Sequence, residues 1–227
     1  MSGPYGVVYL LDDEPGMIKA LTRLLRAERY EVRGFISVRE FLAAPPEDGS
    51  SCLVLDVAMP ELDGMELQRR LAARGYGIPI VFLTGHGDIP MSVRAIKDGA
   101  IDFLTKPVDA QALLAAVRAA LAVSVDRQRS AGETAAWSQR YETLTPREKE
   151  VMAHVVTGQL NKQIAADLGT GEQNIKVHRA RVMEKMQVDS VAELVRIADR
   201  LRKRPSSTSG HPNDTHRKSR LTSVRCG

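Results

Sequence analysis

Several residues whose side chains can do chemistry stand at the ends of short apolar runs in the first half of the sequence. The run Val7–Leu11 is followed by Asp12 and Asp13, and the run Cys52–Leu55 ends on Asp56. A carboxylate at the tip of a buried strand costs free energy unless something pairs with it. One such acid is also explained by a strand that ends in a polar turn, whereas three of them point to a shared cation.

A hydroxyl and an ammonium group occupy comparable positions further along. Thr84 ends another apolar run, and Lys106 follows the short run Asp102–Leu104. Mg²⁺ binds a few carboxylates and keeps several waters, so it suits the acids. Thr84 can then donate to a phosphoryl oxygen, and Lys106 can neutralise another, while Asp56 attacks in line. Taken singly, Thr84 could be a helix cap and Lys106 a solvated loop charge. Together with the three acids, they indicate transfer of a phosphoryl group to a carboxylate.

A parallel sheet would bring these residues to one edge. Five short runs read as strands: Val7–Leu11, Glu31–Phe35, Cys52–Asp56, Ile80–Thr84 and Asp102–Leu104. Four helical patterns lie between them: Pro15–Glu28, Ser37–Leu42, Glu66–Arg74 and Pro90–Lys97. Apolar strands that alternate with helices predict an α/β fold whose parallel sheet is covered on both faces. Five such units match the doubly wound order 2-1-3-4-5, in which ligands sit beyond the C-terminal ends of the central strands.

Residues 6–122 resemble the receiver domain of two-component response regulators, which has a flavodoxin-like fold. The matching motifs are LLDDEP, LVLDVAMPELDG, FLTGHGD and FLTKP. The resemblance implies that Asp56 is the phosphoacceptor and that Asp12, Asp13 and Asp56 bind Mg²⁺. The backbone carbonyl of Ala58, two residues past the phosphoacceptor, would complete the metal shell.

The same resemblance assigns roles to residues of the last two strands. Thr84 and Phe103 correspond to the switch pair of the family, and Lys106 corresponds to its active-site lysine. Phe103 is also explained as a plain core aromatic residue. The bond between Lys106 and Pro107 is expected to be cis by resemblance, although sequence alone gives an X–Pro bond only a ~5% cis population.

The composition is that of a globular protein. Hydrophobic residues make up 43% of the chain, but no stretch approaches about 20 apolar residues, so no transmembrane helix is expected. The N-terminal apolar run lacks a basic region and meets two acids, which argues against a signal peptide. Of the two cysteines, Cys52 reads as a small core residue, and Cys226 is next to the last residue. A cytoplasmic location is therefore expected.

Charge is divided unevenly along the 227 residues, whose net charge is +4. Residues 1–107 contain 12 Lys and Arg against 15 Asp and Glu, whereas residues 108–227 contain 20 against 13. Only the C-terminal part therefore favours a polyanion such as nucleic acid.

A long alanine-rich stretch connects the two parts. No Gly or Pro interrupts residues 109–131, which favours a helix about 35 Å long. Leu113, Val117 and Leu121 form an apolar stripe that is expected to pack on the sheet, and the rest becomes an interdomain spacer. Gly132 weakens a helix without having to end it, so the spacer is either one rod or two segments.

Four helices are expected in the C-terminal part. The first begins at Thr145-Pro146-Arg147-Glu148, which combines an N-cap, a proline at the first helical position and a capping-box glutamate. Asn161–Leu168 and Glu172–Met186 follow, separated by a Gly-Thr-Gly turn, and Ser190 caps a fourth helix that ends near Arg202. A helix, a tight turn and a second helix in this order predict a helix-turn-helix.

The helix expected over Glu172–Met186 has two different faces on a helical wheel. Its buried face is expected to contain Ile175, His178, Val182 and Met186, and Arg179 leans inward beside them. The opposite face combines donors for base edges with small residues for thymine methyl groups. The predicted DNA contacts are Gln173, Asn174, Lys176, Val177 and Ala180, with Lys162, Arg181 and Lys185 on phosphates. A solvated helix surface would also explain this basic face.

Residues 144–202 resemble the LuxR-type helix-turn-helix through the segment LTPREKEVMAHVVTGQLNKQIAADLGTGEQNIKVHRARVMEKMQV. Together with the receiver-like part, this segment identifies the chain as a member of the NarL/FixJ class of response regulators. The segment GHGDIPMSVRAIKDGAIDFLTKP favours the FixJ-like branch, with its StyR-like members. Two residues depart from the pattern, because Gly171 stands where serine is usual and Asn174 where threonine is usual.

The expected organisation is a receiver domain over 1–122, a helical linker over 123–142, a LuxR-type domain over 143–204 and a disordered basic tail over 205–227. A sensor histidine kinase would phosphorylate Asp56, after which the protein would dimerise, bind promoter DNA and act with RNA polymerase as an activator. Two alternatives stay open: a Mg²⁺-dependent phosphatase or phosphotransferase with an aspartyl nucleophile, and a DNA-binding protein whose receiver only dimerises. No loop is long enough to be the cap insertion that such enzymes usually carry.

Overall fold

The computed structural model describes residues 5–44, 46, 49–60, 62–85 and 89–202. The chain divides into two compact units, Met1–Ala135 and Ala136–Gly227, called here the N-terminal and C-terminal units. The finer division expected from the sequence, with boundaries at 122 and 142, stays a prediction. The expected tail, 205–227, and Cys226 lie outside the described residues.

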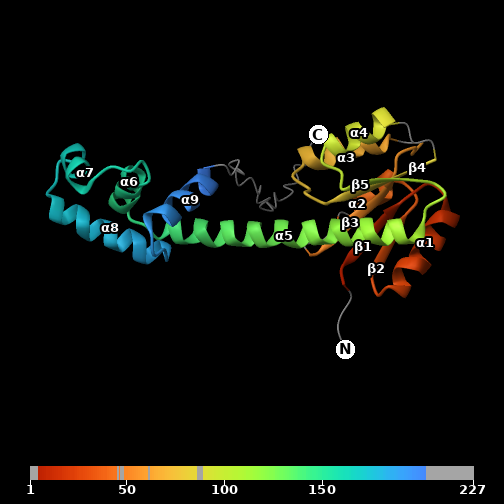
Figure 1. Cartoon of the computed structure of the whole chain (residues 1–227), viewed down its shortest axis with the longest axis horizontal. Helices are drawn as coiled ribbons and strands as arrows, with labels where there is room; N and C mark the ends of the chain where they lie inside the picture. The colour runs from red at the N-terminus through yellow and green to blue at the C-terminus, as the bar shows by residue number, and fades with distance from the viewer. Residues whose placement is uncertain (1–4, 45, 47–48, 61, 86–88, 203–227) are drawn as a thin grey trace, which may run out of the picture. The chain divides into compact units, whose positions relative to one another are not determined.

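The N-terminal unit is built on a five-stranded parallel sheet (Figure 1). Its strands are β1 (Val7–Leu11), β2 (Glu31–Phe35), β3 (Ser51–Asp56), β4 (Ile80–Thr84) and β5 (Asp102–Thr105). They lie in the order β2-β1-β3-β4-β5, and every neighbouring pair is parallel. The predicted order 2-1-3-4-5 is therefore confirmed, and the C-terminal ends of β1, β3 and β4 meet at one edge of the sheet.

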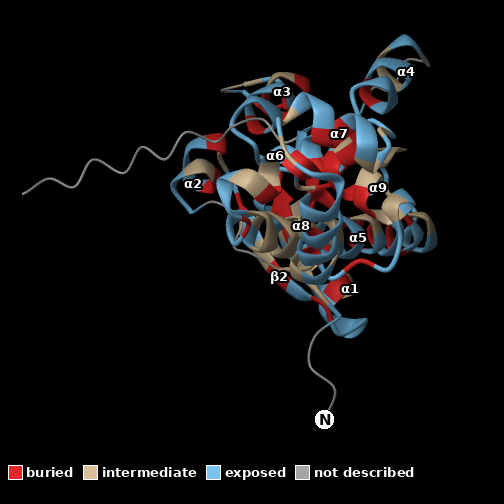
Figure 2. Ribbon diagram, turned by 90° about the vertical axis from the view of Figure 1, so that its left-hand side faces the viewer, coloured by how far each residue is buried: buried red, intermediate tan, exposed pale blue. Residues whose placement is uncertain are grey.

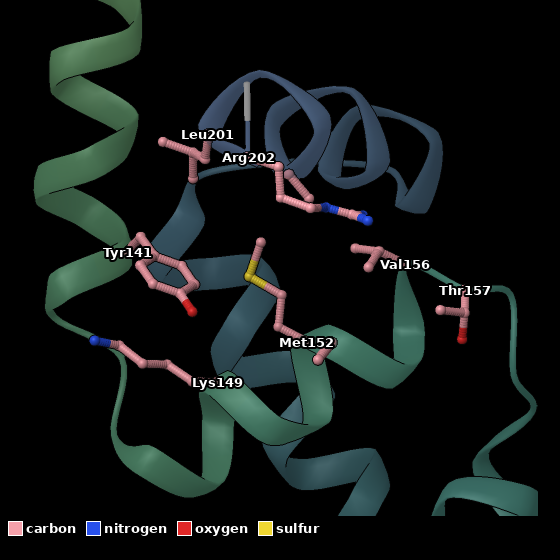
Figure 3. Close-up of a pocket in the computed structure, with 9 residues that line it drawn as sticks. Tyr141, Lys149, Met152, Val156, Thr157, Leu201 and Arg202 are labelled. Carbon is pink, nitrogen blue, oxygen red and sulfur yellow. The ribbon is translucent and has the colours of Figure 1, made fainter. Parts of the chain in front are cut away.

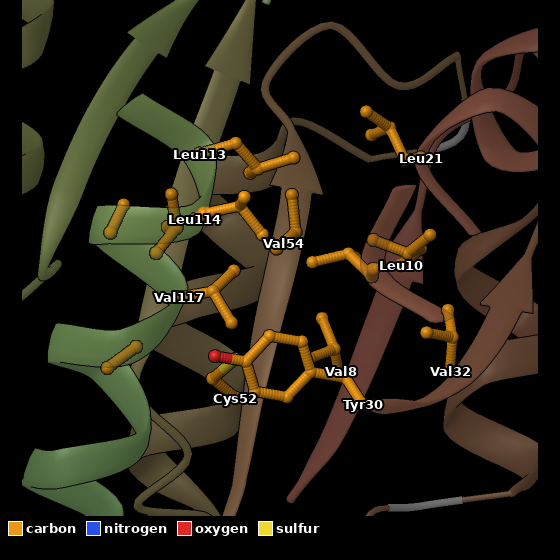
Figure 4. Packing of buried hydrophobic residues seen from close by; sticks show 14 of the residues in the cluster. Val8, Leu10, Leu21, Tyr30, Val32, Cys52, Val54, Leu113, Leu114 and Val117 are labelled. Carbon is orange, nitrogen blue, oxygen red and sulfur yellow. The ribbon is translucent and has the colours of Figure 1, made fainter. Parts of the chain in front are cut away.

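Helices cover both faces of the sheet. Their bounds are α1 (Pro15–Ala27), α2 (Val38–Ala43), α3 (Gly64–Ala73), α4 (Ile89–Lys97) and α5 (Ala110–Glu142). α1 and α5 share one buried cluster with the sheet, in which Leu10, Val54 and Val117 lie close together (Figure 4). α2, α3 and α4 share a second cluster with the other face, around Phe41 and Phe82. Burial on both faces explains why the strands are almost continuously apolar.

Cys52 lies within the first of these clusters (Figure 4). Its side chain is fully buried, and burial raises the pKa of its thiol to about 12. A thiol that stays protonated is a poor nucleophile, so the structure supports the expected role of Cys52 as a small core residue.

α5 is one continuous helix of 33 residues. It passes through Gly132 without a break and extends beyond the expected range 109–131, so the spacer is one helix rather than two segments. The predicted stripe of Leu113, Val117 and Leu121 is buried against the sheet. The last turns of α5 belong to the C-terminal unit, where Trp137 and Tyr141 pack against that unit's core.

The C-terminal unit contains the four expected helices. They are α6 (Pro146–Val155), α7 (Asn161–Asp167), α8 (Glu172–Met186) and α9 (Val191–Arg202). The capping box at the start of α6 is formed, because Thr145 and Glu148 each accept a hydrogen bond from the other's backbone N–H. The apolar sides of the helices enclose one core that includes Val151, Ile164 and Leu194. In Figure 2, buried red and exposed pale blue residues therefore occur along the same helix.

Candidate phosphoacceptor site and DNA-binding surface

Asp56, the predicted phosphoacceptor, is the last residue of β3 and is only 4% exposed. Its Oδ1 atom accepts a hydrogen bond from the backbone N–H of Ala58 at 3.1 Å. Its Oδ2 atom accepts one from the ammonium group of Lys106 at 2.8 Å. Both oxygens have donors, which explains how a carboxylate is tolerated at the end of a fully buried strand.

Asp12 and Asp13 directly follow β1, the neighbour of β3 in the sheet. Asp12 is buried; its Oδ1 accepts a hydrogen bond from the N–H of Glu14 at 2.9 Å, and its Oδ2 lies 2.7 Å from Nζ of Lys106. Burial raises the pKa of the Asp12 carboxyl, while the bonds from Lys106 and from the Glu14 N–H partly oppose that rise. Asp13 is exposed, so it faces solvent at the rim of the same site.

Lys106 is shared among several carboxylates. Besides Asp12 and Asp56, its Nζ lies 3.3 Å from Oε1 of the exposed Glu14. Burial by itself would lower the pKa of Lys106, but the hydrogen bonds to Asp12 and Asp56 outweigh it and raise that pKa above its ordinary value. Lys106 therefore stays charged. Sequence reasoning missed Glu14, because an acid at the start of a helix is common on any protein surface.

The predicted switch residues lie on neighbouring strands. Thr84 is buried at the end of β4, where its backbone carbonyl accepts a hydrogen bond from the N–H of Lys106 at 2.7 Å. Phe103, on β5, is half-buried, and its ring centroid is 6.1 Å from that of Phe82. Both readings of Phe103 remain compatible with this position, so the switch itself stays a prediction.

Two backbone features shape the loop beyond β3 and the end of β5. A Cβ atom on Gly64 would lie 2.7 Å from the carbonyl oxygen of Asp56, so glycine is needed for α3 to start this close to the phosphoacceptor. The N–H of Gly64 also donates to the carbonyl of Val57 at 3.0 Å. The peptide bond between Lys106 and Pro107 is cis, as the family resemblance implied.

The acidic cluster is compatible with a divalent cation. Asp12, Asp13 and Asp56 can each offer a carboxylate oxygen within 4.8 Å of those of the other two. Hard oxygen donors in such a group are the ligands that Mg²⁺ prefers. Even with Lys106 present, the acids outnumber the cation, so the site keeps an excess of negative charge. Ala58, whose carbonyl is the predicted fourth ligand, is exposed in the loop that follows Asp56.

The predicted recognition helix is α8, and its two faces are distinct. Ile175, Val182 and Met186 are buried, as predicted, and belong to the core of the C-terminal unit. The predicted contacts on the other side are all exposed: Gln173, Asn174, Lys176, Val177, Ala180 and Arg181. Lys162, on α7, is exposed as well. Exposed donors beside small residues give α8 a surface with the chemistry that major-groove recognition requires.

Lys185 has a structural contact that the sequence did not suggest. Its Nζ lies 2.6 Å from Oε2 of Glu148, whose side chain is only 3% exposed. The pKa of Glu148 is lowered by the hydrogen bond from Lys185 and, next, by the backbone N–H of Thr145. One carboxylate therefore fixes the start of α6 and the end of α8 together. Nζ of Lys185 also donates to the carbonyl oxygen of Thr143 at 3.3 Å, so a phosphate contact by Lys185, which stays a prediction, would have to use its third N–H.

Two further residues of α8 lean toward the core. Nη1 of Arg179 donates to Oδ1 of Asn161 at 3.1 Å and so braces α8 against α7. His178 is half-buried, and within the described part of the chain no cluster of metal-ligating side chains includes it. His178 was expected on the buried face, and its Nδ1 atom is buried there without a hydrogen-bond partner among the described residues.

A hollow of about 400 Å³ lies between the end of α5, α6 and α9 (Figure 3). Tyr141, Met152 and Leu201 give it an apolar lining, and the ammonium group of Lys149 lies 4.7 Å from the centroid of the Tyr141 ring. No residue of α8 lines the hollow, so it is separate from the predicted DNA-binding surface.

Each of the two units matches a known protein family. The family model described as "Response regulator receiver domain" matches residues 8–118. The model described as "Bacterial regulatory proteins, luxR family" matches residues 142–198. The first match contains every predicted residue of the phosphoacceptor site, and the second contains every predicted DNA contact.

Similar proteins match over most of their length. The response regulator protein TodT of Pseudomonas putida is 44% identical over 202 residues, which are 89% of this chain and 89% of TodT. The transcriptional regulatory protein FixJ of Bradyrhizobium diazoefficiens is 40% identical over 195 residues, which are 86% of this chain and 95% of FixJ. Among solved structures, the response regulator StyR is 42% identical with a TM-score of 0.71, over 86% of this chain and 98% of StyR.

Proposed function

We propose that this chain, which belongs to the response regulators that join a receiver domain to a LuxR-type DNA-binding domain, is switched by a phosphoryl group on Asp56. It is a DNA-binding transcription regulator of a two-component system, and its family is one of regulators rather than of enzymes. The observation that carries the proposal is the pair of contacts, from Lys106 and from the Ala58 N–H, that hold Asp56 at the edge of the sheet.

The phosphoryl group would come from a phosphohistidine of a sensor histidine kinase. The P–N bond breaks, a bond forms between phosphorus and a carboxylate oxygen of Asp56, and the leaving imidazole takes up a proton. Nζ of Lys106 already lies 2.8 Å from Asp56, so a short movement lets it contact a phosphoryl oxygen instead. The hydroxyl of Thr84, at the end of the next strand, would donate to another phosphoryl oxygen.

Asp12, Asp13 and Asp56 would hold Mg²⁺, with the backbone carbonyl of Ala58 as a fourth ligand. When bound, the ion would offset the negative charge that gathers on the transferring group. The chain's own contribution is to hold the acids in register, since β1 and β3 are paired and the N–H of Glu14 fixes the Asp12 carboxylate. Two aligned acids on paired strands favour one cation between them.

The output would follow from movements of Thr84 and Phe103 after phosphorylation. These movements would favour a homodimer, and the dimer would place two copies of α8 roughly 34 Å apart on one side of promoter DNA. We propose that the bound dimer activates transcription through RNA polymerase, and that the organisation is receiver (1–122), linker (123–142) and DNA-binding domain (143–204). No helix among the described residues has the length and apolar character needed to cross a membrane, and we propose that the protein works in the cytoplasm.

Phosphorylation by a small phosphodonor tests the proposal. Wild type, Asp56→Asn and the surface control Asp98→Asn would each be incubated with acetyl phosphate and Mg²⁺ and weighed by intact mass spectrometry. We expect one added phosphoryl group on wild type and on the control, and none on Asp56→Asn. Labelling of Asp56→Asn at the wild-type rate, or no labelling of wild type, would contradict the proposed acceptor.

A further inference from the structure

Two side chains of α5 contact the start of β3, which ends at Asp56, and the loop that leads into β4, which ends at Thr84. Ser124 is 6% exposed, and its Oγ accepts a hydrogen bond from the backbone N–H of Ser51 at 3.1 Å. Ser51 is the first residue of β3, whose last residue is Asp56. Ser124 thus meets, from 73 positions away in the chain, a buried N–H that would otherwise lack an acceptor.

Arg127 makes a second contact, to the loop that leads into β4. Its Nη1 donates to the carbonyl oxygen of Gly77 at 2.6 Å, three residues before β4 begins at Ile80 and seven before Thr84. Arg127 is otherwise exposed, and hollows of about 280 and 250 Å³ are lined by Arg127 and by the loop around Gly77. The contact is therefore held by the hydrogen bond rather than by tight packing around it.

We call these two contacts, Ser124 to Ser51 and Arg127 to Gly77, the strand clamp. The clamp lies one to two turns beyond Leu121, the last apolar residue of α5 in the sheet-facing core. It therefore fixes the part of α5 that leaves the sheet, and the same helix continues to Glu142.

We propose that Ser124 and Arg127 are positioning residues that make α5 respond to the chemical state of Asp56. The proposal rests on the proposed function, since it concerns how phosphorylation reaches the DNA-binding unit. β3 is buried along its whole length, pairs with β1 from Ser51 to Leu55 and pairs with β4 from Leu53 to Asp56, so a close-packed strand connects Asp56 to Ser51 and resists bending. β4 is buried from Ile80 to Thr84, and Pro79 just before it is buried and bonded to the N–H of Leu53, so only Ile78 separates this packed stretch from Gly77.

Linkage makes the coupling measurable. If the clamp is stronger in one state of the Asp56 site than in the other, removing it must weaken the coupling between phosphorylation and DNA binding. A clamp that only stabilises the fold would lower the melting temperature without changing that coupling. The ratio of the DNA affinity with the phosphoryl mimic to the affinity without it therefore distinguishes a clamp that transmits the signal from one that only stabilises the fold.

The test uses the full chain and a DNA duplex that the wild-type protein selects from a random-sequence pool. Binding is measured by fluorescence anisotropy with Mg²⁺, with and without beryllofluoride as the phosphoryl mimic. The variants are Arg127→Ala, the double variant Ser124→Ala/Arg127→Ala, and the rescue variant Ser124→Thr, which keeps a hydroxyl. Arg129→Ala is the matched control, because Arg129 lies on the same helix, is exposed and pairs with Asp126.

Wild type and Arg129→Ala should bind DNA more tightly with beryllofluoride, by a factor in the usual range of roughly 5- to 150-fold. In the double variant we expect this factor to fall below about twofold, with an intermediate value for Arg127→Ala and a near-normal one for Ser124→Thr. Acetyl phosphate should still label Asp56 in every variant.

An undiminished factor in Arg127→Ala and in the double variant would overturn the clamp while leaving the proposed function intact. Arg127→Ala removes only a surface side chain, so it decides the question even if the double variant does not fold. A wild type that shows no response to beryllofluoride would overturn the proposed function and the clamp together.

Discussion

In the N-terminal unit the candidate phosphoacceptor site draws residues from the ends of β1, β3, β4 and β5, and its central groups are buried. In the C-terminal unit most predicted DNA contacts lie on the single helix α8 and are exposed. Nζ of Lys106 lies within 3 Å of a carboxylate oxygen of both Asp12 and Asp56, whereas Gln173, Lys176 and the other exposed contacts stand side by side. In the phosphoacceptor site, each charged group therefore depends on the others. On α8, each exposed contact is independent of its neighbours.

This difference predicts how the two regions respond to substitution. Charges that share one buried partner cannot be removed singly without leaving another charge unpaired, so effects there are large and non-additive. Exposed contacts on one helix face have no shared partner, so their losses are expected to be moderate and nearly additive. The four predictions below test this contrast, from the largest expected effect to the smallest.

Removal of Lys106 should have the largest effect on stability. Lys106→Ala leaves Asp12 and Asp56 buried without their cation, and we expect the free energy of unfolding of the N-terminal unit to fall by about 2 to 4 kcal/mol. Saturating Mg²⁺ should restore a large part of this loss, because it supplies the missing positive charge. Hydrogen exchange of the β3 amides, used to monitor unfolding in urea with and without Mg²⁺, measures the loss and its recovery. The surface variant Lys97→Ala is the control. A loss that Mg²⁺ does not reduce would mean that the acids are not a cation site.

Substitutions on α8 and on α7 should weaken DNA binding in two distinguishable ways. Lys176→Ala is expected to cost about 1 to 3 kcal/mol on the selected sequence and to relax base preference. Lys162→Ala is expected to weaken binding to all sequences alike and to lower the slope of log affinity against log salt by about 1. Anisotropy titrations at several salt concentrations separate the two. A strongly non-additive double variant would contradict the picture of independent contacts.

The ion pair between Glu148 and Lys185 gives the C-terminal unit a buried charge with a cationic partner, as at the phosphoacceptor site. Because the pKa of Glu148 is lower in the folded protein than its ordinary value of 4.5, its stabilising contribution is complete above that value and is lost as the pH falls through the lowered pKa. Glu148→Gln should therefore cost about 1 to 2 kcal/mol at pH 7 and much less once the pH is below the lowered pKa of Glu148. Trp137 is the only tryptophan and lies in this unit, so its fluorescence reports the unfolding. An equal cost at both pH values would show that charge is not involved.

The smallest expected effect is a gain. Gly171 is the N-cap of α8 and makes no side-chain cap, and a Cβ there would meet no heavy atom within 4 Å. Gly171→Ser should raise the free energy of unfolding of the C-terminal unit by a few tenths of a kcal/mol. Trp137 fluorescence during urea unfolding measures it, with wild type as the comparison. A loss of stability would mean that the serine does not reach the N–H groups of the first turn.

The strands and the acidic edge could be predicted because their information is local. Each strand is a short apolar run between turns, and the order of the sheet follows from the alternation of strands with helices. Asp12, Asp56 and Lys106 were found because each stands next to the end of a strand. The helix α8 was found over its full length, Glu172–Met186, because glycine precedes it and the apolar spacing is regular.

Contacts between distant residues could not be predicted in the same way. Nothing near Ser124 shows that its hydroxyl meets the N–H of Ser51, because that pairing depends on how far α5 continues past the sheet. Lys185 looked like a phosphate contact because it follows a basic helix face, but its partner, Glu148, lies 37 positions away. Such pairs depend on the tertiary arrangement and become visible only in the folded structure.

The central claim is that a phosphoryl group on Asp56 controls assembly of the protein. Its most direct test is the mass in solution by light scattering, with and without Mg²⁺ and beryllofluoride, for wild type and Asp56→Asn. The account predicts that the mimic converts wild type from monomer to dimer and leaves Asp56→Asn unchanged. An unchanged mass in wild type, or the same shift in Asp56→Asn, would contradict it.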